Sequence, residues 1–221
     1  MDYVQHTPFW ALAARRARMA LFWNLVGTLS QPVIRILDLG GVGGFWKEQG
    51  IEAHPHLQVT VVNLEPHPPI CAQVTRVVGD ARDCNQWADQ SVDVVFSNSL
   101  IEHLGSWDEQ QAFALSIRRI AKNYFIQTPN YGFPLEPHFM VLGFHYLPIC
   151  IRVKLVQHLA LGWMPKIPDR TDAMRAVQQI RLLGWRECQR LFPDAFIWHE
   201  RFLGLTKSLV AIGGRWRDKV A

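Results

Sequence analysis

Short runs of apolar, mostly β-branched residues recur through the middle of the chain, separated by stretches of helical composition. The runs are continuously apolar instead of alternating with polar residues, as expected for strands that are covered on both faces. Their alternation with helical stretches predicts a parallel, doubly wound sheet. The candidate strands are Val33–Leu39, Val59–Leu64, Val74–Val78, Val92–Ser97 and Tyr124–Thr128.

The segments around these strands supply the candidate helices. Pro8–Leu29 is rich in Ala, Leu, Met and Trp and carries three arginines on a basic side. It predicts a helix that either packs on the edge of the domain or lies on a membrane surface. The other helical stretches are Trp46–Gly50, the region near Pro69–Gln73, Asn85–Asp89, Trp107–Lys122 and Leu182–Phe192.

The end of the chain follows a different pattern. Phe196–Phe202 and Lys207–Ile212 predict two strands joined by a short turn at Gly204–Thr206. We therefore expect an α/β fold with a doubly wound, mostly parallel seven-stranded sheet that ends in a C-terminal antiparallel hairpin. A chain of 221 residues suits a single domain over 1–221. Residues 1–30 are expected to form a helical extension. The Pro- and aromatic-rich segment 129–170 is too long for a plain connection and predicts an insertion or lid over a site.

Composition excludes several classes of protein. The net charge is +4 with scattered basic residues, which is too mild to indicate nucleic-acid binding. The four cysteines share no CxxC spacing, so they predict free thiols in a reducing cytosol instead of a zinc or redox site. No apolar run reaches the length of a membrane span, and the N-terminus lacks the order of a signal peptide. A cytoplasmic location is expected.

The stretch "RILDLGGVGGFW", Arg35 to Trp46, places an aspartate and four glycines directly after the first strand. Glycines allow unusual backbone angles and let a ligand approach backbone N–H groups closely. At the carboxyl end of the first strand of an open α/β sheet, such a loop is typical of a nucleotide-like ligand. A tight turn from strand to helix without a ligand is the alternative.

The residues that follow the glycine loop argue against two classes of ligand. A phosphate-binding loop ends in Lys-Ser/Thr, whereas Phe45 and Trp46 follow Gly44 here. The dinucleotide pattern G-x-G-x-x-G/A, started at Gly41, places the bulky Trp46 where a small residue is needed for close packing.

The segment from Asp38 to Gly44 resembles the first motif of the class I S-adenosylmethionine-dependent methyltransferases, written D/E-x-G-x-G-x-G. The resemblance implies S-adenosylmethionine as cofactor. In that family the acidic residue helps to hold the methionine end, and the glycine backbone lies against the cofactor. Asp38, Gly40, Gly41 and Gly43 are the corresponding residues here. The chain departs from the family at Val42, where the middle glycine usually stands.

Later motifs fit the same family in order. Glu65 ends the second strand and corresponds to the residue that accepts the ribose hydroxyls, with a plain surface acid as the alternative. Asp80 and Ala81 follow the third strand at the position that reads the adenine amino group, although Gly-Asp is also common turn chemistry. Asn98, at the end of the fourth strand, completes the expected cofactor set. The "EHL" from Glu102 to Leu104 resembles the type 11-like branch that includes the ubiquinone and menaquinone C-methyltransferases.

Methyl transfer from a sulfonium is an in-line displacement that mainly requires alignment and exclusion of water. A base is needed only when the nucleophile must lose a proton early. His103, after the fourth strand, and Glu136 with His138, in "LEPHF", are the candidate catalytic residues. Each has a structural alternative, as a cofactor contact or loop cap for His103 and a lid anchor for the others. The chain offers no convincing set of clustered acids and amides, so no metal is predicted.

These observations favour an S-adenosylmethionine-dependent methyltransferase that acts on a small molecule, and we expect methylation at oxygen, with carbon and nitrogen left open. A module that binds the cofactor without turnover remains an alternative, as does a C- or N-methyltransferase with a lipid-linked or hydrophobic acceptor. Aromatic residues of segment 129–170 could line an apolar acceptor pocket or form that segment's own core. Residues Phe144–Leu161 are compatible with peripheral membrane contact. A nicotinamide oxidoreductase and an RNA methyltransferase are disfavoured, and the sequence leaves the oligomeric state open.

Overall fold

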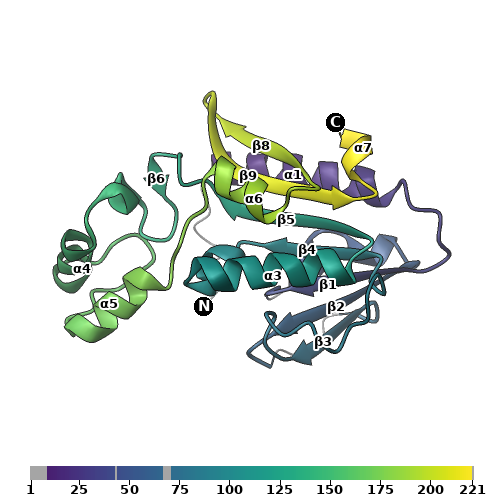
Figure 1. The fold of residues 1–221 in the computed structure, drawn as a ribbon, viewed down its shortest axis with the longest axis horizontal. Helices are drawn as coiled ribbons and strands as arrows, with labels where there is room; N and C mark the ends of the chain where they lie inside the picture. Colours follow the sequence, from purple (N-terminus) through teal and green to yellow (C-terminus); the bar gives the residue numbers. More distant parts are fainter. Residues whose placement is uncertain (1–8, 43, 67–70, 221) are drawn as a thin grey trace.

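A seven-stranded sheet forms the centre of the computed structural model, which describes residues 9–42, 44–66 and 71–220 (Figure 1). The strand order is β3-β2-β1-β4-β5-β9-β8. The first five strands are parallel, and β9 runs antiparallel to both β5 and β8. The predicted fold class is therefore confirmed. The strands are β1 Ile34–Leu39, β2 Leu57–Asn63, β3 Val74–Val78, β4 Val94–Asn98, β5 Asn123–Pro129, β8 Phe196–Phe202 and β9 Leu205–Gly214.

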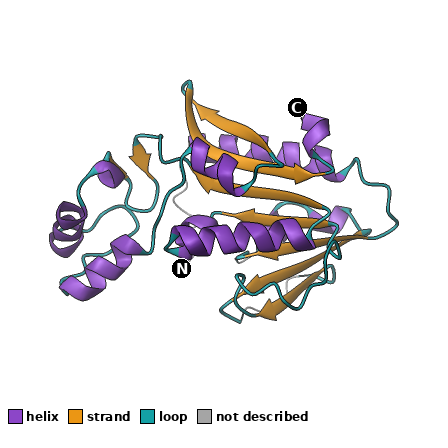
Figure 2. Cartoon of the chain, in the orientation of Figure 1, coloured by secondary structure: helices purple, strands orange, loops and turns teal. Residues whose placement is uncertain are grey.

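Helices cover both faces of this sheet (Figure 2). Helices α3 and α6 lie on one face, and α1 lies on the other, behind β8 and β9 in the view of Figure 1. This arrangement buries the continuous apolar strands on both sides, as their composition predicts. The bounds are α1 Phe9–Val26, α2 Phe45–Glu48, η2 Ile51–Ala53, η3 Ile101–Leu104, α3 Trp107–Ile120, α6 Trp185–Leu191 and α7 Arg217–Val220.

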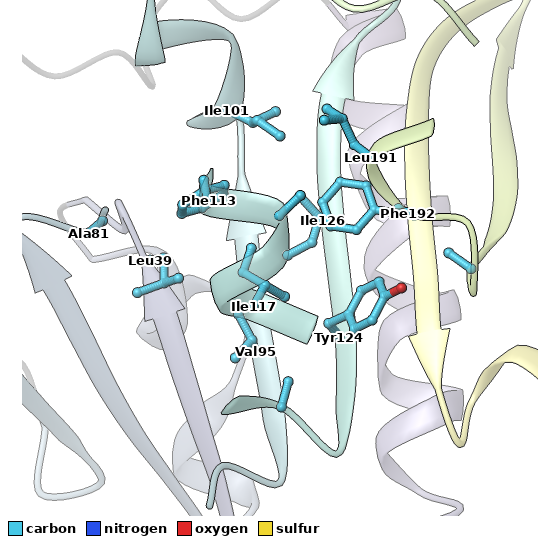
Figure 3. Close-up of a cluster of buried hydrophobic side chains, with 14 of the residues drawn as sticks. Leu39, Ala81, Val95, Ile101, Phe113, Ile117, Tyr124, Ile126, Leu191 and Phe192 are labelled. Carbon is cyan, nitrogen blue, oxygen red and sulfur yellow. The ribbon is translucent and has the colours of Figure 1, made fainter. Parts of the chain in front are cut away.

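Helix α3 illustrates how the local sequence sets the packing. Ser106 caps the helix, because its hydroxyl oxygen accepts the backbone N–H of Glu109 at 3.2 Å. Phe113 and Ile117 recur at helical spacing and are both buried against the sheet. Figure 3 shows them beside strand residues of β4 and β5, in a core that also includes Phe192, the residue directly after α6.

The opposite core is aromatic. Phe22 of α1 is fully buried, and its ring makes edge contacts with Phe96, Phe125 and Trp216. Helix α1 is thus one of the layers that cover the sheet, although the sequence assigned it to an extension spanning residues 1–30. It ends at Val26, before the predicted Leu29, because Gly27 and the residues after it turn the chain.

A small lobe follows β5 and extends beyond the carboxyl ends of β4 and β5 (Figure 1). It corresponds to the predicted insertion 129–170 and continues through α5. Its elements are β6 Leu135–Glu136, β7 Val141–Leu142, η4 Phe144–Tyr146, α4 Ile149–His158 and α5 Arg170–Gln178. The lobe has its own core, in which the rings of Phe139 and Phe144 stack with centroids 4.2 Å apart. Within the described ranges, no helix is both long and apolar enough to cross a membrane.

Some local predictions were wrong. Asn85–Asp89 forms turns instead of a helix, since the side chain of Asp83 accepts the backbone N–H of Asn85 and competes with helical bonding. The predicted helix near Pro69–Gln73 falls partly outside the described residues, and residues 71–73 form a bend and turn.

Two boundaries at the end of the chain also shift. Helix α6 starts only after Gly184, three residues later than predicted. The hairpin turn lies at Leu203 and Gly204, with φ angles of 48° and 81°, one residue before the predicted turn. Both residues have the positive φ that a tight hairpin turn requires.

Candidate functional site

Asp38 stands near the carboxyl end of β1 and is buried, with 1% of its surface exposed. The indole Nε1 of Trp46 donates a hydrogen bond to its Oδ2 at 2.7 Å. Its Oδ1 is buried and has no hydrogen-bond partner among the residues that the structure describes. Desolvation raises the pKa of Asp38 to about 7, although the hydrogen bond from Trp46 opposes this shift. One carboxylate oxygen is therefore left over for a ligand.

The glycines next to Asp38 leave no room for side chains. Gly40 has φ 82°, and a Cβ there would lie 2.8 Å from Cδ1 of Leu100. A Cβ on Gly41 would lie 2.0 Å from Oδ2 of Asp38. The side chain of Asn63 at the end of β2 donates to the Gly41 carbonyl at 2.8 Å and fixes the loop. The predicted Gly43 lies outside the described residues.

A small cavity opens at this loop between the carboxyl ends of β1 and β4. It brings together four residues of the predicted cofactor set, and Val42 at its rim is 61% exposed. Because that side chain points largely to solvent, its departure from the glycine pattern leaves the cradle open. The cavity is lined by Asp38, Gly40, Gly41, Val42, Phe45, Phe96 and Asn98.

The residues of this cavity could hold the methionine end of S-adenosylmethionine, the cofactor that the sequence predicts. The unpartnered oxygen of Asp38 suits an ammonium group, and the side-chain-free loop allows close approach to backbone. Oδ1 of Asn98 is also buried without a partner in the described part of the chain. We therefore assign Asp38, Gly40, Gly41 and Asn98 to one candidate cofactor cradle.

The other predicted cofactor residues lie elsewhere. Glu65 is exposed and lines a separate cavity at the ends of β2 and β3. Asp80 is held by Arg82, whose Nε donates to both carboxylate oxygens at 3.0 and 2.9 Å. That hydrogen bonding lowers the pKa of Asp80. The side chain of Ala81 is buried in the same core cluster as Phe113 and Ile117 of α3, so only its backbone could contact a ligand.

The three predicted catalytic residues meet at the junction of the sheet and the small lobe. His103 belongs to η3 after β4, whereas Glu136 and His138 come from β6 and the turn after it. Glu136 Oε1 lies 2.7 Å from Nδ1 of His138, and the Nε2 atoms of His138 and His103 are 3.2 Å apart. The sequence identified these residues separately, and folding places them in one row.

The surroundings of the two imidazoles shift their pKa values in opposite directions. Desolvation and then the charge of His138 lower the pKa of His103 to about 4. Desolvation also acts on His138, but its hydrogen bond and attraction to Glu136 outweigh it and raise the pKa of His138. Between the two rings, His138 is therefore the one that protonates first.

Sequence reasoning missed the role of Glu102, the first residue of the "EHL" stretch. Its side chain is fully buried, and desolvation raises its pKa to about 7. One potential ligand atom from each of Glu102, His103 and His138 lies within 4.8 Å of the other two. These three side chains could hold a metal ion, although the sequence predicted none.

A second cavity, of about 140 Å³, adjoins the cradle because Asn98 lines both. Its lining includes the apolar residues Phe133 and Met140 and the basic residues Arg15, Arg18 and Lys207. The remaining lining residues are Ser99, Gln127, Pro129, Asn130, Leu135, Pro137 and Ser208.

The backbone of this second cavity is strained at two points. Ser99 and Met140 have φ angles of 56° and 52°, a region that residues other than glycine rarely adopt. Such strain is concentrated at functional sites. The cavity is therefore a candidate for binding the second substrate.

Comparison with known proteins gives one family match and several structures with a similar fold. Residues 37–124 match the family model described as a methyltransferase domain. No curated protein sequence matches the chain. Among solved structures, a SAM-dependent methyltransferase from Methanosarcina mazei has a TM-score of 0.51 at 11% identity, and the match covers 86% of this chain and 96% of that one.

Two further structures are larger than this chain. An O-methyltransferase family protein from Burkholderia thailandensis has a TM-score of 0.53 at 14% identity, over 94% of this chain and 58% of that one. Phosphoethanolamine N-methyltransferase 2 from Haemonchus contortus, in complex with S-adenosyl-L-methionine, has a TM-score of 0.53 at 18% identity, over 83% and 38%. The family match covers less than half of the chain, and the solved structures show that the chain shares their fold.

Proposed function

We propose that this protein transfers a methyl group from S-adenosylmethionine to an oxygen atom of a small-molecule acceptor. The observation that carries the proposal is the sharing of Asn98 by two cavities at the end of β4. One has the unpartnered carboxylate oxygen and bare backbone that suit the cofactor, and the other has room for an acceptor. An in-line displacement requires two such sites side by side.

The cofactor, when bound, supplies an activated methyl group on a neutral leaving group. The residues of the chain bind, orient and exclude water. Asp38 would hold the ammonium of the methionine end, and Glu65 the ribose hydroxyls at the end of β2. Asp80 would have to share its carboxylate with Arg82 to reach the adenine amino group, so its assignment is the weakest of the set.

The second cavity favours an acceptor with an apolar body and an anionic group. Glu200 accepts hydrogen bonds from Arg18 at 2.9 Å and from Lys207 at 3.2 Å, so these two basic residues share one carboxylate. Arg15 adds a further positive charge to the lining of the second cavity. A carboxylate or phosphate on the acceptor would form charge-assisted hydrogen bonds with Arg15 in this cavity.

Methylation at oxygen needs a place for the proton of the hydroxyl group. If Glu136 accepts the Nδ1 proton of His138, the Nε2 lone pair of His138 can accept a proton from Nε2 of His103. Nδ1 of His103, which has no hydrogen-bond partner among the described residues, could then take up the acceptor's proton. Glu136, His138 and His103 are for this reason the proposed catalytic residues.

A C- or N-methyltransferase with a lipid-linked or hydrophobic acceptor is the second candidate. The small lobe carries exposed apolar residues beside Arg152 and Lys154, a composition suited to contact with an anionic membrane surface. The exposed residues are Leu142, Tyr146, Ile149, Ile151, Leu159 and Trp163. Indifference of the purified protein to anionic liposomes would remove the membrane part of this candidate.

The location in the cell is also part of the proposal. The four cysteines are free thiols in the structure, and Cys84 and Cys188 are buried. Buried thiols without disulfides are typical of a reducing compartment, so we propose a cytoplasmic protein.

The first experiment is a calorimetric titration of the full chain with S-adenosylmethionine, S-adenosylhomocysteine and NADH. Binding of the first two at micromolar concentration, without NADH, is expected. Glu65→Ala should abolish this binding while circular dichroism stays unchanged. A screen of hydroxylated acids with labelled cofactor then tests turnover, and cofactor binding without turnover of any acceptor would favour a binding module instead.

A further inference from the structure

We propose that Glu102, His103 and His138 bind a divalent first-row transition metal ion. One ligand atom from each lies within 4.8 Å of the other two. Two imidazoles and one carboxylate are ligands that Zn²⁺, Fe²⁺ and related ions accept, and three protein ligands leave coordination positions open. The inference concerns metal binding by the free protein, in which the ion would replace the hydrogen bond between Nε2 of His103 and Nε2 of His138, and it does not depend on the proposed cofactor binding.

The two imidazoles converge on one point. Their Nε2 atoms are 3.2 Å apart, a separation that two ligands on the same ion also have. Glu136 lies 2.7 Å from Nδ1 of His138 and, by accepting a proton there, leaves the Nε2 lone pair of His138 directed at His103. The ring of His138 is thereby fixed in the tautomer that a metal ligand needs.

Glu136 is itself firmly held. It is 1% exposed, and its second oxygen, Oε2, accepts the backbone N–H of Phe139 at 2.7 Å. A carboxylate that holds the far nitrogen of a ligating histidine is a common support of metal sites, because it orients the ring and increases its basicity. We assign Glu136 as a positioning residue of the metal site.

Glu102 supplies an independent observation. Its side chain is fully buried, and Oε2 accepts the hydroxyl of Thr128 at 3.0 Å. Its Oε1 has no hydrogen-bond partner anywhere in the described ranges. A buried carboxylate oxygen without a partner is costly. A cation bound between this oxygen and the two imidazoles would offset that cost.

The ligands come from two parts of the fold. Glu102 and His103 lie in η3, directly after β4, whereas His138 lies in the turn between β6 and β7 of the small lobe. A bound ion would therefore tie the lobe to the edge of the sheet. Because the ion binds the folded chain and not the unfolded one, it should also raise the melting temperature.

The test uses the untagged full chain after treatment with a chelator. Titration with Co²⁺, followed by its visible absorption, and with Zn²⁺, followed by calorimetry, should each give one ion per chain. His103→Ala and His138→Ala should each weaken binding by more than about tenfold and remove the rise in melting temperature. His158→Ala, an exposed histidine on α4, is the matched control and should bind as the wild type does.

Glu136→Gln tests the supporting contact, and its affinity should fall by about 10–100-fold while the stoichiometry stays at one ion. Absence of stoichiometric binding would overturn the proposal, as would equal affinities of the wild type, His103→Ala and His138→Ala. His103 is exposed, so its variant is expected to fold even if the buried positions tolerate change poorly. None of these measurements requires cofactor or acceptor. Metal binding without cofactor binding would contradict the proposed function alone, and the reverse result would contradict this proposal alone.

Discussion

The indole of Trp46 donates its N–H to Oδ2 of Asp38 across 2.7 Å, and both side chains are buried. In the sequence, Trp46 is the residue that rules out a dinucleotide pattern. In the structure, it fills the space below the glycine loop and fixes the carboxylate that faces the cofactor cradle. The same bulky residue therefore excludes one ligand class and prepares the site for another.

Trp46→Phe should separate these roles, since it keeps an aromatic ring and removes the N–H donor. We expect the free energy of unfolding to fall by about 1–3 kcal/mol, because a buried carboxylate oxygen loses its partner. Affinity for S-adenosylmethionine should also fall, as the carboxylate is no longer held in place. Urea unfolding and calorimetry measure the two effects. Trp185→Phe, at a residue that is 48% exposed, is the control and should change neither quantity.

Gly41→Ala should abolish cofactor binding. Its new Cβ would lie 2.0 Å from Oδ2 of Asp38 and 3.0 Å from Cγ1 of Val61, so the carboxylate or the loop must move. Gly44→Ala is the matched control, because no atom lies within 4 Å of a Cβ at that position. Equal cofactor affinities of the two variants, measured by calorimetry, would contradict the placement of the cradle at Gly41.

The sheet could be predicted because the pattern that indicates each strand lies within a short stretch of sequence. Five continuous apolar runs, separated by helical stretches, allow few arrangements other than a parallel sheet with both faces covered. Short helices were harder to predict. Asn85–Asp89 has helical composition, but the hydrogen bond from Asp83 turns the chain there. A single side chain thus outweighs the weak propensity of five residues.

Site residues that are close together in the sequence could be predicted as a group, whereas the contacts between distant residues could not. Asp38, Gly40 and Gly41 form one loop, and their motif could be recognised directly. His103 and His138 are 35 residues apart, so their contact depends on how the small lobe folds back onto the end of β4. Glu102 was noticed only as part of the "EHL" motif, because a buried, unpartnered oxygen is a property of the tertiary structure.

Stability should depend on pH through Asp38. Desolvation raises its pKa from 3.8 to about 7 in the folded protein, so the folded state holds a proton that the unfolded state has released. The free energy of unfolding should therefore decrease as pH rises between these values. Asp38→Asn cannot ionise, and its stability should fall less from pH 5 to pH 8. Denaturant unfolding at both pH values measures the difference. Asp108→Asn, at an exposed position, is the control. If the free energy of unfolding of Asp38→Asn changed with pH as much as that of Asp108→Asn does, the raised pKa of Asp38 would be contradicted.

The hairpin turn offers a route to higher stability. Leu203 has φ 48° and is 86% exposed, so its side chain gains little from burial while its backbone is strained. Leu203→Asn should increase the free energy of unfolding by about 0.5–1 kcal/mol, because Asn tolerates this conformation better. Leu205→Asn, in strand β9 beside the turn, should bring no gain. A loss of stability in Leu203→Asn, measured by urea unfolding, would show that the leucine side chain is needed there.

Substitution of Arg15 tests whether the acceptor binds in the second cavity. It lines the second cavity, whereas Arg16, its neighbour on α1, is exposed and does not. Arg15→Ala should raise KM for an anionic acceptor found in the screen by about tenfold, the effect of losing one charge-assisted hydrogen bond. Affinity for S-adenosylmethionine should stay unchanged, because Arg15 does not line the cofactor cradle. Arg16→Ala controls for the general loss of positive charge and should leave KM near the wild-type value. Equal effects of the two substitutions would mean that the acceptor is attracted by the overall charge of α1 and is not bound in this cavity.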